Sequence, residues 1–264
     1  SMNIIIHRGT HQIGGSVIEI STASTRIVLD FGNELSLDEK YTSINLDING
    51  VTKGIPDCDG IVISHYHMDH LGQLTSALPE IPLYMGELSK EIAIISAEYQ
   101  DKVLYLRLLG ANTFHGGEAF TIGNIHIRPL VIDHSAADSY MFVIEAEGKR
   151  VLYTGDFRMH GLRHHILEKL VNTYIGEVDV LITEGTSLSR DAEECISEAA
   201  VLEDISSYIQ DGKYVFVMCS STNIDRIMGI WQNMPTDKVL ICDAYQKRIL
   251  DTVINNVYYE SSLY

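Results

Sequence analysis

Residues Ile61 to Leu71 read I-V-I-S-H-Y-H-M-D-H-L, and this stretch decides how the chain is interpreted. Its first three residues form an apolar run that is typical of a buried strand, and the run ends at Ser64. Four candidate metal ligands then follow within six residues: His65, His67, Asp69 and His70. Imidazole and carboxylate groups together favour zinc or a similar divalent cation.

The spacing of these four residues indicates how they are shared between ions. His65 and His67 are two residues apart, so both point to one side if the chain is extended. Asp69 and His70 are adjacent, so they diverge and can serve a second ion. A single His after a strand is usually a polar loop residue, but three His and one Asp so close together are hard to explain as a solvated surface. We therefore favour a metal site.

Length and composition place the chain among globular proteins. Its 264 residues are enough for one large domain, or for one domain and part of another. No apolar run is long enough to cross a membrane, and the first residues lack the pattern of a secretion signal. The four Cys are widely spaced and form no C-x-x-C pair. They predict reduced, mostly buried thiols of a cytoplasmic protein.

The formal net charge of −17 bears on the class of substrate. A protein that binds nucleic acid usually has a basic face or stripe, and no Lys/Arg run here exceeds two residues. Local patches and bound cations matter more than the total charge. The acidic balance therefore counts against a nucleic-acid substrate without excluding one.

Apolar runs and turn residues predict an alternation of strands and helices. Strands are expected at 3–9, 16–20, 26–30, 60–64, 118–122, 125–132, 139–146, 150–154 and 178–184, and helices at 70–78, 87–109 and 162–171. The pattern then changes to helices at 192–210, 223–233 and 244–256 with strands at 213–218 and 239–243, which predicts the beginning of a parallel sheet. We expect Ser221 or Thr222 to cap the helix from 223, with phosphate binding at this junction as the alternative.

Several other predicted strands end in polar residues that suit a metal site. Taken singly, each such residue is more often a turn or cap residue. Taken together around the motif at 65–70, they predict one site at a sheet edge. These residues are Asp30, His134, Asp156 and Glu184.

The motif H-x-H-x-D-H, followed in order by His134 and Asp156, resembles the signature of the metallo-β-lactamase superfamily. The resemblance implies an α/β fold of the αββα sandwich type. It implies a first metal held by His65, His67 and His134, and a second metal held by Asp69 and His70. Asp156 would bridge the two metals, and Asp30 would support the site. Asp rather than Cys at 156 resembles the hydrolase branches more than the true β-lactamases.

A finer match concerns the segments D-H-S-A-A-D-S (133–139), T-G-D-F-R (154–158) and T-E-G-T-S (183–187). They resemble the β-CASP group of nucleases, and within it the ribonuclease J family, which has an acidic residue at the position of Glu184. Residues 215–227 resemble the first strand and helix of the inserted β-CASP domain. We therefore expect a metallo-β-lactamase-like domain at 1–190, followed at 191–264 by the beginning of a truncated β-CASP domain.

The chain departs from the group in two places. Gly-Thr follows Glu184 where the group often has Ser-Thr. The sequence also reaches Tyr264 before the late motifs, which carry one His that ligates the second metal and another near the leaving group. The resemblance therefore covers the N-terminal part only, and we expect the second metal site to be incomplete.

The resemblance implies a metal-dependent phosphodiester hydrolase that acts on single-stranded RNA. Its nucleophile would be a hydroxide bound to two divalent ions, zinc or alternatively manganese, with Asp69 and Asp156 as catalytic carboxylates. Unpaired edges of the truncated domain favour a homodimer. We expect about one tightly held metal per chain and little cleavage. Two alternatives stay open: a small-molecule hydrolase such as a thioesterase or lactonase, which the acidic charge favours, and a non-catalytic metal-binding module.

Overall fold

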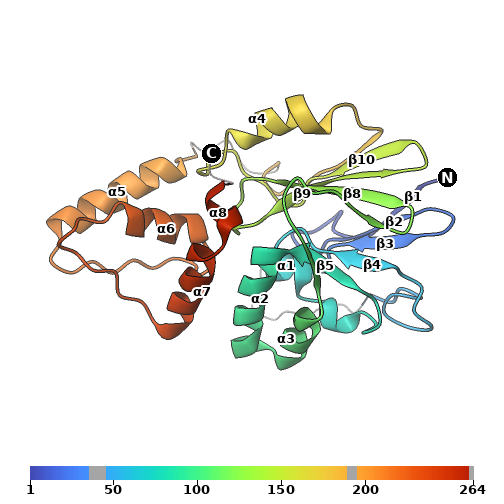
Figure 1. The fold of residues 1–264 in the computed structure, drawn as a ribbon, viewed down its shortest axis with the longest axis horizontal. Helices are drawn as coiled ribbons and strands as arrows, with labels where there is room; N and C mark the ends of the chain where they lie inside the picture. The colour runs from blue at the N-terminus through green and yellow to red at the C-terminus, as the bar shows by residue number, and fades with distance from the viewer. Residues whose placement is uncertain (36–45, 189–194, 262–264) are drawn as a thin grey trace.

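The computed structural model describes residues 1–35, 46–188 and 195–261, and its centre is a pair of β-sheets packed face to face (Figure 1). Helices lie on the outer face of each sheet, and four further helices form a lobe at one end. The predicted αββα sandwich is confirmed by this arrangement.

The first sheet has six strands in chain order, which are antiparallel from β1 to β3 and parallel from β3 to β6. Their bounds are β1 (Asn3–Arg8), β2 (Val17–Ser21), β3 (Arg26–Leu29), β4 (Gly60–Val62), β5 (Leu83–Gly86) and β6 (Asn112–Phe114). β5 and β6, which have only four and three residues, were not predicted from the sequence. Such short runs carry little periodic signal.

The second sheet has five strands in the order β11-β10-β9-β8-β7. Neighbouring strands of this sheet are antiparallel except for β10 and β11, which are parallel. Their bounds are β7 (Phe120–Ile122), β8 (Ile125–Val131), β9 (Tyr140–Ala146), β10 (Lys149–Tyr153) and β11 (Val180–Ile182). A hairpin turn at Glu147 and Gly148 joins β9 to β10, and both residues have positive φ, as a tight hairpin turn requires.

The strands alternate their side chains between two cores, as the period of two demands. In β2 and β3, Ile20 and Ile27 face the layer between the sheets, whereas Val28 faces the helices. In β9, Phe142 faces the layer between the sheets and Val143 faces the opposite side. Burial on both faces therefore fixes the register, because a one-residue slip would exchange the two sets.

Short helices cover the outer faces of the sandwich (Figure 1). The first sheet carries α1 (Met68–Leu71), a 3-10 turn (Leu74–Ser76), α2 (Glu87–Gln100) and α3 (Lys102–Leu109). The second sheet carries α4 (Ile166–Leu170), which continues into a π-helical turn (Val171–Ile175). The single helix predicted at 87–109 is wrong, because Asp101 is extended and its side chain accepts hydrogen bonds from the amides of Val103 and Leu104 at the start of α3.

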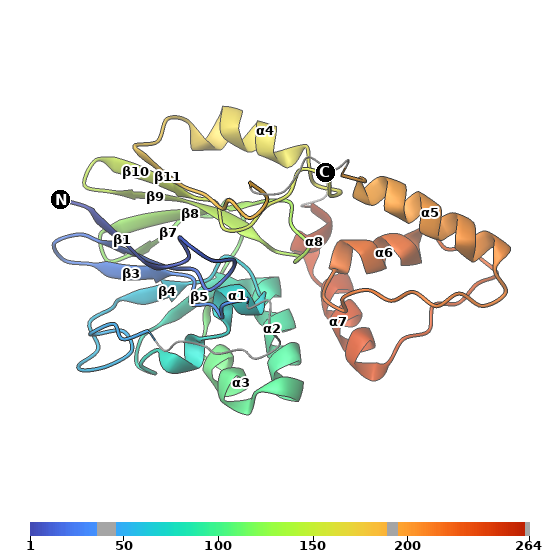
Figure 2. The same ribbon diagram turned by 180° about the vertical axis from the view of Figure 1, so that it is seen from behind.

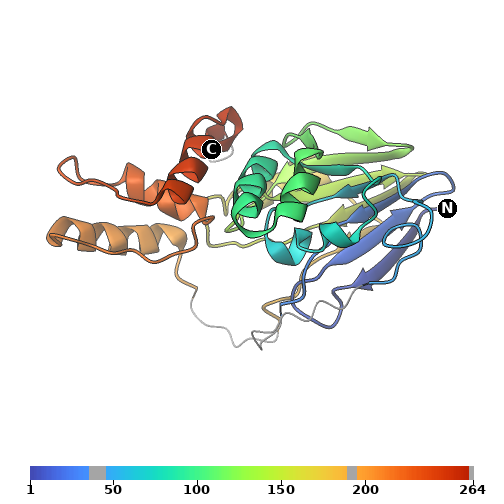
Figure 3. The same ribbon diagram turned by 90° about the horizontal axis from the view of Figure 1, so that it is seen from below.

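The lobe contains α5 (Glu198–Asp211), α6 (Ile224–Gln232), α7 (Ala244–Ile254) and α8 (Val257–Ser261), and it lies beside the sandwich in Figures 2 and 3. The strands predicted at 213–218 and 239–243 are wrong, since neither segment is paired within the described chain. Phe216 is 97% exposed and Ile241 is 87% exposed. Apolar sequence alone does not make a strand when no neighbouring strand supplies hydrogen bonds.

The predicted boundary between residues 190 and 191 lies outside the described residues. The lobe nevertheless shares a core with the sandwich, because Ile227 and Val253 belong to the same buried cluster as Ile92 of α2. The hydroxyls of Tyr245 on α7 and Ser96 on α2 lie 2.8 Å apart and form a hydrogen bond. The lobe is therefore packed against the sandwich through both apolar and polar contacts.

Two smaller expectations are corrected. The N-cap of α6 is Asn223, and it makes no side-chain capping bond, so neither Ser221 nor Thr222 caps this helix. Cys195 and Cys242 are exposed, and Cys58 and Cys219 are half-buried, so the thiols are not mostly buried. Across 1–35, 46–188 and 195–261, no helix combines the length and the apolar composition that crossing a membrane requires.

The capping role of Asp101 is directly testable. Asp101→Ala removes the acceptor of two amides at the start of α3, so we expect the free energy of unfolding to fall by about 1 kcal/mol. Urea denaturation followed by circular dichroism measures the change. Asp57→Ala is the control, because that side chain is 87% exposed and its loss is expected to change stability by less than about 0.5 kcal/mol. Equal effects of the two substitutions would contradict the capping assignment.

Candidate metal centre

The candidate ligands gather where several strands reach their carboxyl ends. Asp30 follows β3, the motif at 65–70 follows β4, and Asp156 follows β10. His134 follows β8 of the second sheet. The amide of Tyr140 donates a 3.1 Å hydrogen bond to the carbonyl of Ser64, which holds the two sheets together beside the site. Sheet ends of this kind are common places for functional residues in α/β folds.

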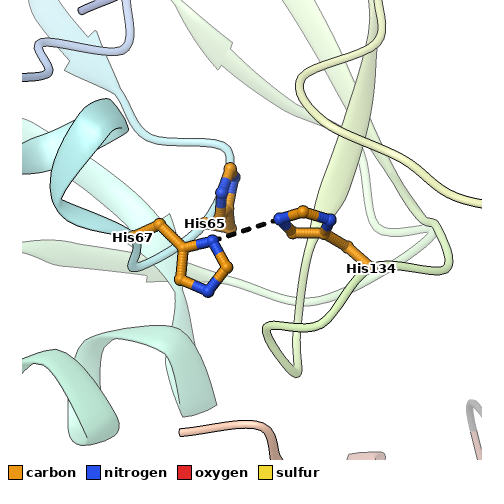
Figure 4. A group of neighbouring side chains, drawn as sticks. All are labelled: His65, His67 and His134. Carbon is orange, nitrogen blue, oxygen red and sulfur yellow. Dashed lines mark hydrogen bonds between the residues drawn. The ribbon is translucent and has the colours of Figure 1, made fainter. Parts of the chain in front are cut away.

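Three imidazoles form the first compact group (Figure 4). The ligand nitrogens of His65, His67 and His134 all lie within 4.8 Å of one another. Nδ1 of His67 and Nε2 of His134 are 3.1 Å apart, and the two rings meet nearly edge to face. Figure 4 shows the three rings converging from two different segments of the chain. One cation can therefore contact all three.

These three imidazoles are neutral near pH 7. Burial and the neighbouring imidazoles lower the pKa of His65 well below its usual value. Burial and nearby His70 lower the pKa of His67 to about 4. Burial and His67 lower the pKa of His134 to about 3. A neutral ring offers a lone pair, so the group is ready to bind a cation without first losing protons.

The hydrogen bonds around His65 assign its free nitrogen. Ser64 Oγ donates to Asp30 Oδ2 at 2.8 Å and lies 3.0 Å from Nδ1 of His65. Because the hydroxyl proton is used on Asp30, Ser64 accepts from His65, which places the ring proton on Nδ1. Nε2 of His65 is then a buried acceptor, and it has no hydrogen-bond partner among the described residues. An orphaned lone pair facing two other neutral imidazoles fits a zinc-type cation.

A second group adjoins the first and shares His65 with it. The ligand atoms of His65, His70 and Asp156 lie within 4.8 Å of one another. Nε2 of His70 is 3.3 Å from Asp156 Oδ2 and 3.5 Å from Asp69 Oδ2. Asp69 thus approaches His70 but is in neither compact group. The structure brings together five of the six predicted ligands and places the sixth at their margin.

The two members of the second group that are not shared with the first, His70 and Asp156, are charged. Burial lowers the pKa of His70, but Asp30 and Asp156 outweigh burial and raise this pKa well above the usual value. Burial raises the pKa of Asp156, but the hydrogen bond from His70 and its charge bring it below the usual value. Burial dominates at Asp69 and raises its pKa. An imidazolium beside an ionised carboxylate occupies this half of the site, so cation binding there must displace the proton of His70.

Asp30 is the anchor of the site. It is fully buried with a φ of 57°, a conformation that Asp tolerates better than most residues. Its Oδ1 accepts from the amide of Ser64 at 2.7 Å. Its Oδ2 accepts from His70 Nδ1 at 2.7 Å, from the Tyr153 hydroxyl at 2.6 Å and from Ser64 Oγ. This single carboxylate therefore orients the segment that carries the motif.

Backbone amides from two loops, one after Asp30 and one at Gly15, bond the turn at Asp69 and His70. The amide of Phe31 donates to the His70 carbonyl at 2.7 Å, and the amide of Gly15 donates to the Asp69 carbonyl at 3.0 Å. A Cβ added at Gly32 would lie 1.5 Å from the Asp69 carbonyl oxygen, so only glycine fits there. These backbone contacts hold the second group in position.

Glu184 acts on the site through the backbone. Its Oε1 accepts a 2.8 Å hydrogen bond from the amide of Phe157, the residue after Asp156. Sequence reasoning missed two supporting residues, Ser64 and Tyr153, which both bind Asp30. Each is adjacent to a strand end, but only the fold shows that they meet the same carboxylate.

A cavity of about 790 Å³ opens beside the second group. Its walls include the Gly-rich segment 9–14 and the segment 182–186. Asp69, His70, Asp156, Glu184 and His11 are among the lining residues. A space of this size accommodates a substrate against the carboxylates.

Comparison with known proteins identifies the fold family. A family described as "Beta-lactamase superfamily domain" matches residues 25–209. The chain belongs to this superfamily. Curated relatives include an RNase J-like protein of Methanocaldococcus jannaschii, which is 25% identical over 223 residues, and Ribonuclease J of Helicobacter pylori, which is 24% identical over 244 residues. The resemblance of the motifs to the superfamily and to ribonuclease J is thereby confirmed.

The matches cover most of this chain but a smaller share of the relatives. Endoribonuclease ysh-1 of Neurospora crassa is 24% identical over 277 residues, which is 97% of this chain and 31% of that protein. The two proteins above are matched over 80% and 83% of this chain but only 49% and 33% of their own lengths. The chain thus spans about half or less of these relatives.

One solved structure supports the fold. A protein of unknown function from Enterococcus faecalis V583 superposes with a TM-score of 0.81 at 20% identity. The superposition covers 94% of this chain and 66% of that one. The lobe is therefore included in the shared architecture along with the sandwich.

Removal of the first imidazole group tests the metal site. The double variant His65→Ala/His67→Ala is expected to lose the tightly bound metal, because two of three converging neutral donors disappear. Metal content per chain is measured by inductively coupled plasma mass spectrometry after gel filtration. His126→Ala serves as the control, since His126 is exposed on β8 and distant in the sequence from the motif. Undiminished metal in the double variant would overturn the assignment.

The anchoring role of Asp30 gives a stability prediction. Asp30→Asn keeps the shape and tolerates positive φ, but its amide group cannot accept from all the donors that surround it. We expect the free energy of unfolding to fall by about 3 kcal/mol, because a buried charged partner of His70 is lost. Asp59→Asn, whose carboxylate accepts from the exposed amide of Arg26, should cost less than about 1 kcal/mol. Chemical denaturation compares the two, and similar losses would argue against a special role for Asp30.

Proposed function

We propose that this chain is a metal-dependent phosphodiester hydrolase of the ribonuclease J type that acts on RNA. The observation that carries the proposal is the pair of adjoining ligand groups at the strand ends, three neutral imidazoles beside His70 and Asp156, next to a cavity of about 790 Å³. Two neighbouring cation sites suit phosphoryl chemistry, because both the attacking and the leaving oxygen need charge stabilisation.

The names of the relatives support RNA as the substrate class. Three proteins from an archaeon, a bacterium and a fungus match this chain over at least 80% of its length and are named as RNase J-like protein, ribonuclease or endoribonuclease. We propose single-stranded RNA as the form that is bound and the cytoplasm as the location. We retain a homodimer as the proposed assembly, and 191–264 as the start of a β-CASP domain.

We assign the ligands of two divalent cations to named residues. His65, His67 and His134 would hold the first, and Asp69, His70 and Asp156 the second, with Asp156 between them. Zinc suits the imidazole-rich first group, and manganese is the alternative at the carboxylate-rich second group. When bound, such cations supply Lewis acidity that generates a nucleophile from water and neutralises phosphoryl charge.

The residues of the chain itself orient this chemistry. Asp30 fixes the ring of His70 and the backbone of Ser64. Glu184 fixes the backbone next to Asp156 through the amide of Phe157. Asp69 and Asp156 line the cavity, so they are the carboxylates that we assign to the reaction. We propose that the first cation is bound more tightly, because its three donors are already neutral while His70 is protonated.

A second candidate function is hydrolysis of a small molecule by the same site. The chain carries a net charge of −17, and the cavity is lined by three carboxylates of Asp69, Asp156 and Glu184. Such a wall repels a polyanion when no cation is bound, whereas a neutral thioester or lactone would enter freely. This observation alone keeps the alternative open.

Cleavage assays on defined substrates separate the two functions. Metal-loaded protein is incubated with a 5′-monophosphorylated single-stranded RNA, with the matching single-stranded DNA, and with a chromogenic thioester and lactone. We expect weak cleavage of RNA, because the second metal site is expected to be incomplete, and we expect a chelator to abolish it and zinc or manganese to restore it. Hydrolysis of the thioester or lactone with RNA left intact would replace the proposal by the small-molecule alternative. Metal binding without turnover of any substrate would favour a non-catalytic module.

The role of Asp156 yields a prediction on activity. Asp156→Asn removes the charge between the two ligand groups, so we expect RNA cleavage to fall at least about 100-fold. The free energy of unfolding should fall by less than in Asp30→Asn, because the Asp156 side chain is 25% exposed at the cavity whereas Asp30 is fully buried. Glu118→Gln is the control, since that carboxylate is 69% exposed near His115 and should keep full turnover. A variant of Asp156 with full turnover would show that the residue is dispensable.

A further inference from the structure

Tyr66 stands between the two metal-site histidines of the motif but makes contacts of a different kind. Its ring is buried, with 6% exposed, and belongs to the core cluster on the helical side of the first sheet. Its hydroxyl donates a 2.6 Å hydrogen bond to the carbonyl of Thr222 and accepts a 2.9 Å hydrogen bond from the amide of Ala137. Both partners are backbone groups of segments far away in the sequence.

The two partners belong to segments that matter for the first ligand group. Ala137 lies three residues after His134, in the loop that follows β8. Thr222 lies just before α6, in the lobe. The residues beside these two also meet directly, because Ala136 and Asn223 form an isolated antiparallel bridge. The hydroxyl of Tyr66 therefore joins the loop of His65 and His67, the loop of His134 and the lobe at one point.

The segment that Tyr66 contacts is itself held by the helices of the lobe. Nε2 of Gln246 on α7 donates a 2.9 Å hydrogen bond to the carbonyl of Ser221. Ile224, the first residue of α6, is fully buried in the core shared with α2. These contacts hold residues 221–223 in place, and the hydroxyl of Tyr66 bonds this segment. We call residues 221–223 the platform.

We infer that Tyr66 is a positioning residue through which the segment 221–223 of the lobe holds His65, His67 and His134 at binding distance from one another. The inference rests on the metal-binding part of the proposed function. The three imidazoles come from two loops. The amide of Tyr140 bonds the carbonyl of Ser64 beside the site, and the hydroxyl of Tyr66 adds a second connection between the two loops that also includes the lobe.

The physical reason is the cost of leaving buried polar groups unpaired. Without the hydroxyl, the buried amide of Ala137 and the half-buried carbonyl of Thr222 lose this hydrogen-bond partner. The two loops would then separate to reach water, and the three ligand nitrogens would no longer be preorganised. Loss of a group that orients metal ligands typically weakens metal binding about 10–100-fold.

Substitution of Tyr66 by Phe tests the inference, with Tyr245→Phe as the matched control. Both substitutions remove one tyrosine hydroxyl that bonds across the junction of sandwich and lobe, but Tyr245 bonds Ser96 on α2 and not a ligand loop. The dissociation constant of the tighter Zn²⁺ is measured by competition with a chromophoric chelator, and the thermal midpoint of the metal-free protein is measured in parallel. We expect Tyr66→Phe to weaken Zn²⁺ binding about 10-fold or more and Tyr245→Phe to change it less than about twofold.

The outcomes separate failure of this inference from failure of the proposed function. Equal Zn²⁺ affinity in wild type and Tyr66→Phe would overturn the inference, as would equal weakening by Tyr66→Phe and Tyr245→Phe. Absence of Zn²⁺ binding in the wild type would overturn the metal-dependent function itself, and the inference with it. If Tyr66→Phe does not fold, Gln246→Leu takes its place, because it releases the platform at Ser221 while leaving Tyr66 intact. A several-fold weaker affinity in that variant supports the inference, and an unchanged affinity overturns it.

Discussion

The buried carboxylate of Asp30 is the constraint on which the rest of the site depends. One side chain accepts from a backbone amide, a serine hydroxyl, a tyrosine hydroxyl and an imidazole. Burial and Asp30 together raise the pKa of Tyr153 well above its usual value, so the phenol stays a donor. Because Tyr153 ends β10 and Ser64 follows β4, the same carboxylate connects the two sheets. A buried network of this kind is favourable only when every polar group in it has a hydrogen-bond partner. The groups around Asp30 meet this condition, so the network can be completely buried.

The electrostatic division of the site follows from this anchor. Asp30 and Asp156 flank His70 and keep it protonated, whereas at His65, His67 and His134 burial has the largest effect and lowers the pKa of each ring. The imidazole ring of His70 therefore differs in charge from those of His65, His67 and His134, although the four rings are close together. A cation entering the first group finds lone pairs at once, and a cation entering the second must compete with a proton. The two groups therefore differ in how readily they would accept a cation, because different carboxylates lie near each of them.

The lobe also makes specific buried ionic contacts with the sandwich. Two chains of buried charges cross from the sandwich to α6. Arg163 pairs with Asp225, which also accepts from the hydroxyl of Tyr259 at 2.8 Å. Glu198, at the start of α5, accepts two hydrogen bonds from Arg226, of 2.8 and 2.9 Å. Its Oε2 also lies 3.6 Å from Nη1 of Arg158. Arg158 in turn bonds Asp133, the residue before His134. Removing one partner of such a buried pair is destabilising, because it leaves the other charge buried without compensation.

The sequence by itself predicted the candidate metal ligands and, through the family resemblance, the layers of the sandwich. The ligands at 65–70 are local, so their spacing was legible, and His134 and Asp156 follow strands whose apolar runs were clear. Residue type did not predict which side chains of β2, β3 and β9 face each core, because these strands are mostly apolar and buried on both faces. Only the tertiary structure decided that His65 belongs to both ligand groups, that Asp69 stands at their margin, and that Tyr66 reaches Thr222. The physical reason is that each of these depends on which distant segment packs alongside. For the same reason, residues 213–218 look like a strand in sequence yet form none in the described chain, since a strand exists only with a paired neighbour.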